Sequence, residues 1–141
     1  MACRNPGPDV ASFDMAATTR ILLIDDEPDF TALFKENLEE SGNYEVQVVN
    51  DPKKAVAAAE KFLPELIFVD VVMPGMDGGD VVTAIRANSR FARTPVLMLT
   101  ALVEEDPSKP TGESERGGLT FVSKTTRLEK ILAIIERSLA G

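Results

Sequence analysis

The sequence predicts a doubly wound α/β domain, in which helices cover both faces of a parallel β-sheet. Two observations predict it. Short apolar runs alternate along the chain with longer segments, most of which repeat their apolar residues at helical spacing. Each gap between the apolar runs also exceeds the dozen or so residues that a parallel crossover connection needs. Alternating β and α units of this kind imply a parallel sheet between two layers of helices.

Five apolar runs are the candidate strands. Three of them are almost continuously apolar, which is typical of strands buried on both faces. The second run instead alternates, with Glu45 and Gln47 on one face and Val46 and Val48 on the other, and this favours an edge strand. The candidate strands are residues 21–25, 45–49, 66–70, 96–100 and 119–122.

Three connecting segments and the C-terminal segment carry helical patterns. The second helix opens with Asp51 and Pro52, an N-cap followed by proline at the first helical position. Val81, Val82 and Ile85 mark the third helix. The apolar positions of the first and last helices are Phe30, Leu33, Phe34 and Leu38, and Leu128, Ile131, Leu132, Ile135 and Leu139.

The connecting segment 104–118 is the exception. It contains no apolar residue and five Pro or Gly residues, so a helix there would have no apolar side chain to pack against the sheet. We therefore expect a mobile, solvated loop with one helical turn at most, and a fourth helix that is short or absent. Such a loop would leave the last helix more exposed, and Ile134, beside the main apolar stripe, is expected to join a partner-binding patch.

Composition narrows the setting. A chain of 141 residues fits one domain with a real core, here residues 19–141 after a flexible N-terminal tail of residues 1–18. A net charge of −8 argues against binding to nucleic acid and is compatible with binding cations. The single cysteine, Cys3, excludes an internal disulfide, so a cytoplasmic location is expected. No apolar run approaches the roughly 18 to 20 residues of a membrane span, and no membrane partner is expected.

Carboxylates stand at the carboxyl ends of two predicted strands. Asp25 and Asp26 end the first strand and Asp70 ends the third. Ligands of open α/β sheets bind beyond these ends, so the three side chains converge if the two strands are neighbours. A lone aspartate is more often a helix cap or turn residue, but three at equivalent positions favour a shared role. Their repulsion is relieved by a small hard cation, and oxygen ligands suit Mg²⁺ or Mn²⁺.

Two other strand ends add a hydroxyl and an ammonium group. Thr100 closes the fourth strand and Lys124 follows the fifth. Each alone has an ordinary explanation, as a β-branched strand residue and a solvated charge. Above a metal-bound carboxylate they supply donors for the oxygens of a transferred phosphoryl group.

Four motifs, in this order and within about residues 20–139, resemble the receiver domain of two-component response regulators, the CheY-like family. They are LLIDDEPD, IFVDVVMPGMDG, PVLMLTA and FVSK. The resemblance implies a flavodoxin-like (βα)5 fold with strand order 2-1-3-4-5. It also implies that Asp70 accepts a phosphoryl group from the phosphohistidine of a histidine kinase or phosphotransfer protein. Asp26, Asp70 and the backbone carbonyl of Val72 would ligate Mg²⁺ directly, and Asp25 would act mainly through a metal-bound water.

The same resemblance assigns the remaining site residues. Thr100 and Lys124 would contact the phosphoryl oxygens, and Phe121 occupies the position of the switch aromatic. The family usually has proline after the lysine, whereas Thr125 stands here. A cis bond without proline would cost about 3 to 4 kcal/mol, so a trans bond is expected. Segment 104–118 is the second departure, because the family places its fourth helix there.

The leading interpretation is a stand-alone receiver that catalyses only its own phosphorylation and dephosphorylation and signals by binding an unknown downstream protein, as a monomer or weak dimer. It rests on the absence of an output domain after Gly141. An adaptor that signals without phosphate, and a phosphatase that uses an aspartyl-phosphate, are the alternatives. The family resemblance implies that Val72 and Leu102 flank the path of the hydrolytic water, and because both are apolar we expect slow self-dephosphorylation.

Overall fold

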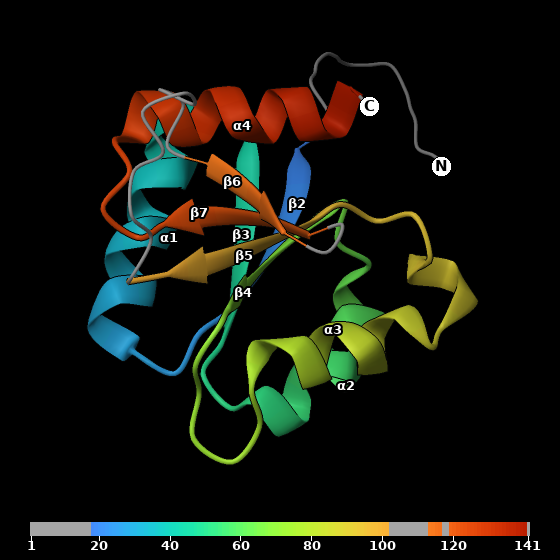
Figure 1. Ribbon diagram of the computed structural model, residues 1–141. Coiled ribbons are helices and arrows are strands. Elements are labelled where there is room, and N and C mark those ends of the chain that lie inside the picture. Colours follow the sequence, from blue (N-terminus) through green and yellow to red (C-terminus); the bar gives the residue numbers. More distant parts are fainter. Residues whose placement is uncertain (1–17, 102–112, 117–118, 141) are drawn as a thin grey trace, which may run out of the picture.

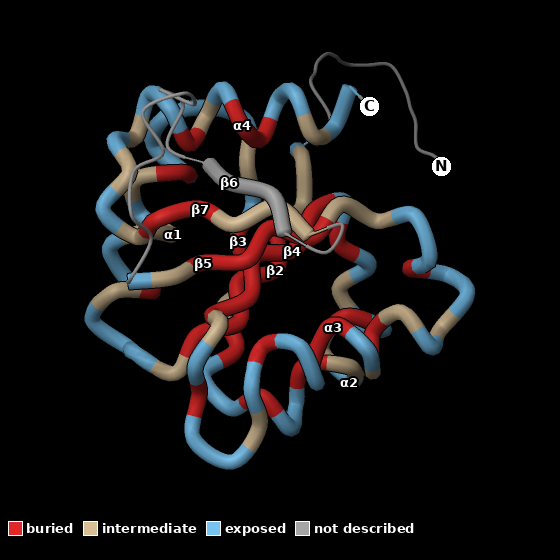
Figure 2. The backbone as a smooth tube through the Cα atoms, viewed as in Figure 1, coloured by how far each residue is buried: buried red, intermediate tan, exposed pale blue. Residues whose placement is uncertain are grey.

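Apolar side chains on alternate positions of the strands form two cores, one on each face of a central sheet. The computed structural model describes residues 18–101, 113–116 and 119–140. Figure 1 shows α1 and α4 on one side of the sheet and α2 and α3 on the other. Figure 2 shows that buried residues concentrate in the strands, whereas the outward faces of the helices are exposed.

The sheet has the predicted parallel order. The five parallel strands are β2 (Thr19–Ile24), β3 (Tyr44–Val49), β4 (Leu66–Asp70), β5 (Val96–Thr100) and β7 (Leu119–Ser123). They are arranged β3-β2-β4-β5-β7, which is the order 2-1-3-4-5. β3 lies at an edge, as its alternating pattern predicted. The flavodoxin-like fold is therefore confirmed.

Four α-helices lie in the described residues, where the apolar spacing predicted them. Asp51 accepts a hydrogen bond from the Lys53 N–H at 3.0 Å and so caps a short 3₁₀ turn, η1 (Pro52–Lys54), which leads into the second helix. A second 3₁₀ turn, η2 (Ser89–Phe91), precedes β5. The α-helices are α1 (Pro28–Ser41), α2 (Ala55–Phe62), α3 (Gly78–Arg86) and α4 (Leu128–Ala140).

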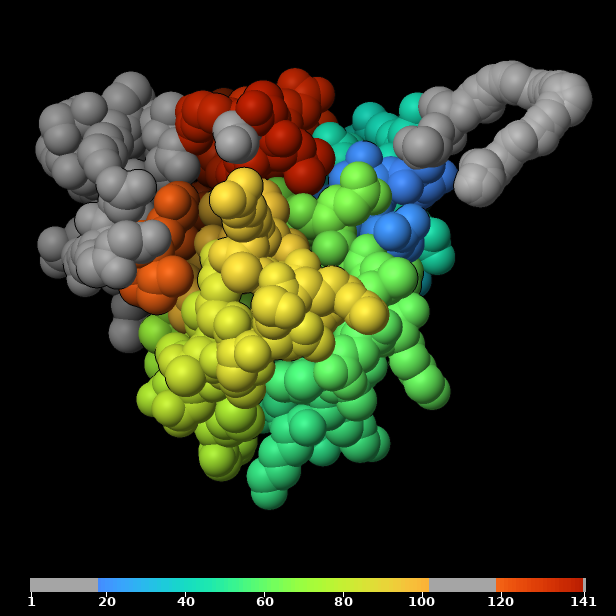
Figure 3. Space-filling view, turned by 90° about the vertical axis from the view of Figure 1, so that its right-hand side faces the viewer, coloured from blue at the N-terminus to red at the C-terminus, as the bar shows by residue number. Residues whose placement is uncertain are grey.

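Successive side chains of a strand point to opposite faces of the sheet, so alternate residues of each strand belong to different cores. On one face, Leu23 and Phe68 belong to the same buried cluster as Leu38 of α1 and Ile135 of α4. The other face packs against Ala59 of α2 and residues of α3. Figure 3 shows α4 on one side of the molecule and α2 and α3 on the opposite side.

Part of the segment expected to be a solvated loop is instead a strand. Residues Glu113–Arg116 form β6, which pairs antiparallel with β7 and extends the sheet beyond it. The loop expectation is therefore wrong for these four residues, because backbone hydrogen bonds to β7 can hold a strand that has no apolar side chain. No helix occurs among the described residues between β5 and β7, in agreement with a fourth helix that is short or absent. The rest of segment 104–118 and the N-terminal residues 1–17 lie outside the described part of the chain.

The expectation that Ile134 joins an exposed patch is also wrong. Its side chain is 1% exposed and packs in the core between α4 and the sheet. The buried positions of α4 are Ile131, Ile134 and Ile135, which share one face at i, i+3 and i+4 spacing. Within residues 18–101, 113–116 and 119–140, no helix has the length and apolar character needed to cross a membrane.

Candidate functional site

Three carboxylates meet at the carboxyl edge of the sheet. β2 and β4 are neighbours, with Ile24 opposite Val69, so the residues that end these strands lie side by side. Asp25, Asp26 and Asp70 each offer one oxygen within 4.8 Å of the others. The structure therefore brings together the three aspartates singled out in the sequence.

Asp25 is fully buried beneath this edge. Its Oδ1 accepts a hydrogen bond from the Glu27 N–H at 3.0 Å, and its backbone carbonyl accepts one from Asn50 Nδ2 at 2.8 Å. Its Oδ2 has no well-directed hydrogen bond within the described residues, although the Lys124 ammonium lies 2.8 Å away. Burial raises the pKa of Asp25, and Lys124 opposes this rise.

Asp70 is the last residue of β4 and is almost fully buried. Burial, reinforced by repulsion from Asp25, raises the pKa of Asp70 to about 6. The ammonium of Lys124 and a hydrogen bond from the Val72 N–H counteract the rise. Without a further cation, these surroundings disfavour the ionised form of Asp70.

A glycine allows β4 and α3 to approach closely. The Gly78 N–H donates to the Val71 carbonyl at 2.9 Å, one residue past Asp70. A Cβ on Gly78 would lie 2.4 Å from the backbone oxygen of Asp70, so no other residue fits without a shift. Gly75 has φ +81° and supplies the left-handed turn of the same loop.

Lys124 extends from the end of β7 into the carboxylate cluster. Its Nζ lies 2.8 Å from Asp25 Oδ2, 2.5 Å from Glu27 Oε1 and 3.5 Å from Asp70 Oδ2. It also lies 4.8 Å from the centre of the Phe30 ring, where an ammonium is attracted to the aromatic face. Burial disfavours its charge, but the bonds to Asp25 and Glu27 outweigh this and raise the pKa of Lys124 above its usual range. The ammonium is therefore charged at neutral pH.

Thr100 and the loop after β7 complete the site. The Lys124 N–H donates to the Thr100 carbonyl at 2.9 Å, which ties the lysine to the end of β5. No cis peptide bond occurs in the described residues, so the bond to Thr125 is trans, as predicted. Phe121 is half-buried and packs against the core on the side of α2 and α3.

Residues that end or follow β2, β4, β5 and β7 line an open cleft of about 640 Å³. Polar groups of Asp26, Asp70, Thr100 and Lys124 form part of its wall. Val72 lies on its rim and is 72% exposed, whereas Leu102 lies outside the described residues. The cleft can admit a charged group from solvent and place it against the Asp70 carboxylate.

Sequence reasoning missed two contacts of Lys124. Glu27 directly follows the aspartate pair, and Phe30 was predicted only as a core residue of the first helix. No spacing rule connects either residue to Lys124, because Glu27 and Lys124 are 97 residues apart in the chain. The only signal was the crowding of charge around the first strand end.

The site fits a small divalent cation. Asp25 and Asp70 are both buried, and both have raised pKa values. The Oδ2 of Asp25 also lacks a well-directed hydrogen bond within the described residues. Carboxylate oxygens are the donors that Mg²⁺ and Mn²⁺ prefer. A cation at this position would relieve the repulsion that Lys124 alone leaves.

Comparison with known proteins points to one family. The family model described as the response regulator receiver domain matches residues 21–136. The DNA-binding dual master transcriptional regulator RpaA of Synechocystis is 39% identical over 114 residues, which are 81% of this chain and 46% of that protein. The chain spans about half the length of the first curated relatives it matches.

Solved structures agree with this match. Chemotaxis protein CheY4 of Vibrio cholerae superposes with a TM-score of 0.72 at 32% identity, over 86% of this chain and 99% of that one. The receiver domain of a sensor histidine kinase from Pseudomonas aeruginosa superposes with a TM-score of 0.73 at 27% identity, over 89% of this chain and 100% of that one. That second structure has a magnesium ion coordinated in its active site cleft.

Proposed function

The chain belongs to the response regulator receiver family, and on that premise we propose that it accepts a phosphoryl group on Asp70 and signals through a phosphorylation-dependent change in partner binding. The observation that carries the proposal is the position of Asp70. Its carboxylate opens onto the cleft, with the Lys124 ammonium 3.5 Å away and two further aspartates beside it.

The donor in this proposal is a phosphohistidine on a histidine kinase or phosphotransfer protein. An oxygen of Asp70 attacks phosphorus in line with the leaving nitrogen. The new P–O bond forms as the P–N bond breaks, and the imidazole leaves with the electron pair of that bond and takes up a proton. With a pKa near 6, Asp70 is mostly ionised at neutral pH and can act as the nucleophile.

The surrounding residues have distinct roles. Lys124 offers a positive charge to the phosphoryl oxygens, and Thr100 offers a hydroxyl to them. Asp26 and Asp70, with the carbonyl of Val72, would hold Mg²⁺ directly and Asp25 would hold it through water; the bound cation would offset the negative charge of the incoming group. The chain catalyses only its own phosphorylation and dephosphorylation in this proposal.

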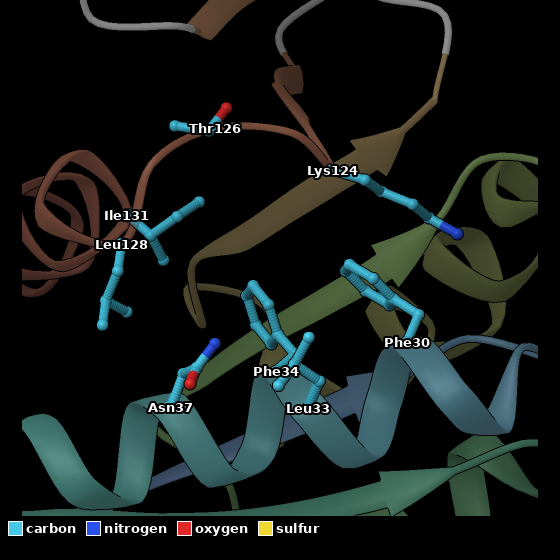
Figure 4. Close-up of a pocket in the computed structure, with 8 residues that line it drawn as sticks. All are labelled: Phe30, Leu33, Phe34, Asn37, Lys124, Thr126, Leu128 and Ile131. Carbon is cyan, nitrogen blue, oxygen red and sulfur yellow. The ribbon is translucent and has the colours of Figure 1, made fainter.

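A donor protein would cover the apolar pocket beside the cleft. This pocket, of about 160 Å³, lies between α1 and the start of α4, and Figure 4 shows its side chains. Its apolar lining is Phe30, Leu33, Phe34, Leu128 and Ile131. Lys124 lines both the pocket and the cleft, and Leu33 is 58% exposed. We propose that a donor places an apolar side chain here while its phosphohistidine faces Asp70.

The output side of the proposal involves Thr100 and Phe121. Movement of Thr100 toward the phosphoryl group would give the half-buried Phe121 room to change position, and a downstream protein would read that change. The stand-alone arrangement, the monomeric or weakly dimeric state and the cytoplasmic location stay predictions. The similarity to a DNA-binding regulator of about twice the length favours a second candidate, in which this receiver controls an attached DNA-binding domain.

The test is phosphorylation by acetyl phosphate with Mg²⁺, followed by intact-mass measurement. We expect one phosphoryl group on the wild type and none on Asp70→Asn. Labelling of neither protein would favour the phosphate-independent adaptor, and sustained release of phosphate from added esters would favour a phosphatase. For donor docking, Leu33→Asp should slow transfer from a phosphotransfer protein of the same genome but leave the rate with acetyl phosphate unchanged.

A further inference from the structure

Hydroxyl groups hold the turn that follows β7. The Oγ of Ser123 accepts a hydrogen bond from the Thr125 N–H at 3.1 Å and lies 2.7 Å from the Thr125 hydroxyl. The Thr126 N–H donates to the Ser123 carbonyl at 3.1 Å. Ser123 is buried and Thr125 is exposed, so the pair links the buried end of β7 to the outer side of the turn. Side-chain hydroxyls that bond to the backbone two residues on are a recognised way to fix a tight turn.

The residue enclosed by this turn is Lys124. Its side chain must cross the cleft edge to bring Nζ within 2.8 Å of Asp25 Oδ2 and 3.5 Å of Asp70 Oδ2. A lysine side chain has several rotatable bonds. The backbone of Lys124 fixes the direction in which this flexible side chain leaves the chain. The Thr100 carbonyl fixes the Lys124 N–H on one side, and the Ser123–Thr125 pair fixes the peptide on the other.

We propose that the Ser123–Thr125 hydroxyl pair is a positioning device that aims Lys124 at the acceptor. This inference rests on the proposed function, because the aim of Lys124 matters only if Asp70 accepts a phosphoryl group. Thr125 stands where proline is usual in the family, and proline would restrain the turn through its ring. Here two hydroxyls supply the restraint through hydrogen bonds.

The plainer explanation is that the hydroxyls only terminate β7 and lead into α4. The neighbouring Thr126 provides the matched control. Its Oγ1 is buried in the same turn but has no hydrogen-bond partner among the described residues. If any hydroxyl in the turn served equally, Thr126 would behave like Thr125. If the pair positions Lys124, only changes at Ser123 and Thr125 should affect the site.

The experiment compares five variants of the full chain. Ser123→Ala and Thr125→Val remove the hydroxyls, Ser123→Thr and Thr125→Ser retain them, and Thr126→Val is the control. With acetyl phosphate and Mg²⁺, we expect Ser123→Ala to be phosphorylated about tenfold more slowly, because small misplacements of a catalytic group cost rate steeply. Thr125→Val should lose about threefold, since its N–H can still reach Ser123. The retained-hydroxyl variants and Thr126→Val should stay within about twofold of the wild type.

Two further readouts separate positioning from general damage. Mg²⁺ affinity, measured by calorimetry, should change less than twofold in every variant. Acylation of Lys124 by an amine-reactive reagent, measured by peptide mapping, should become several times faster in Ser123→Ala, while other lysines react as before. The labelling needs no phosphoryl transfer. A wild type that is not phosphorylated would therefore contradict the proposed function, while the labelling would still test how Lys124 is positioned. The positioning role would be overturned if Lys124 of Ser123→Ala were labelled at the wild-type rate. It would also be overturned if the phosphorylation rate and the Mg²⁺ affinity fell together.

Discussion

Glu27 and Lys124 form an ion pair at the mouth of the cleft, with Oε1 and Nζ 2.5 Å apart. The side chain of Glu27 is 62% exposed, whereas the lysine it contacts also contacts the buried Asp25. One ammonium is thus shared between a solvent-facing carboxylate and the carboxylates of the site. In the proposed function, Lys124 would offer an incoming phosphoryl group the same charge that Glu27 engages.

Removing the charge of Glu27 should therefore favour phosphorylation. We expect Glu27→Gln to raise the rate with acetyl phosphate about two- to fivefold, since a competing anion and some repulsion of the donor are both lost. The effect on the free energy of unfolding should stay below about 1 kcal/mol, because the Glu27 side chain is largely exposed and Lys124 keeps its contact with Asp25. Glu36→Gln, the same charge change on the exposed face of α1, is the control. A rate for Glu27→Gln equal to that of the control would show that Glu27 does not compete for Lys124.

The raised pKa of Asp70 predicts a pH dependence of stability in the metal-free protein. The ordinary pKa of 3.8 rises to about 6 in the folded state, so the folded protein binds this proton more tightly than the unfolded chain. That stabilisation is fully present below the unfolded value and is lost as the pH rises through 6. Denaturant unfolding in EDTA should give a lower free energy of unfolding at pH 7.5 than at pH 5.

Asp70→Asn isolates this contribution from the general repulsion of an acidic chain. The variant should be more stable than the wild type at pH 7.5, by up to about 3 kcal/mol for a shift of this size. At pH 4 the two proteins should differ little. An equal pH dependence in both would mean that Asp70 is not the group responsible.

Divalent metal should reverse the same destabilisation. Mg²⁺ at about 100 times its Kd should add roughly 2.7 kcal/mol to the free energy of unfolding, because it binds only the assembled carboxylates. Asp26→Ala should abolish the response, and it should stabilise the metal-free protein slightly because one negative charge of the cluster is gone. Thermal melts with Mg²⁺ or EDTA measure both effects. A wild-type melting temperature that does not change at millimolar Mg²⁺ would argue against a metal site.

The sequence predicts that the main residues of the site lie together, because each of them ends or follows a strand. Asp25, Asp70, Thr100 and Lys124 follow or close runs whose apolar character is unmistakable, and parallel strands present their carboxyl ends at one edge. Such reasoning uses only local pattern and topology. It therefore brings the three aspartates together, but it does not find contacts made by residues that end no strand, such as the contact of Glu27 with Lys124.

β6 escaped prediction for a different reason. The residues Glu113–Arg116 lack the apolar alternation by which strands are found, because pairing with β7 is made by backbone groups. One signal was present. Gly117 and Gly118 stand between the two strands, and a Gly-Gly pair is typical of two-residue hairpin connections. Ile134 was misjudged because the helical stripe was drawn too narrowly, although Ile131 and Ile135 flank it on the same face.

The lifetime of the phosphorylated state should depend on Val72. A water that hydrolyses the aspartyl-phosphate must approach through the cleft, and Val72 stands on its rim with a side chain that cannot hydrogen-bond to that water. Leu102, which the family resemblance places on the other side of this path, is equally apolar. Because positioning is a large part of phosphoryl-transfer catalysis, we expect slow self-dephosphorylation.

Polar replacements should shorten that lifetime. Val72→Asn combined with Leu102→Glu should speed phosphate loss by about tenfold, which corresponds to roughly 1.4 kcal/mol of barrier. Val72→Asn alone should account for part of the change, since it places an amide on the rim of the cleft. The measurement is the decay of phosphorylated protein with Mg²⁺ present and the donor removed, and Leu139→Asn, an exposed apolar site on α4, is the control. Wild-type decay within seconds, or a double variant that decays no faster than the control, would show that water reaches the phosphoryl group without help from these positions.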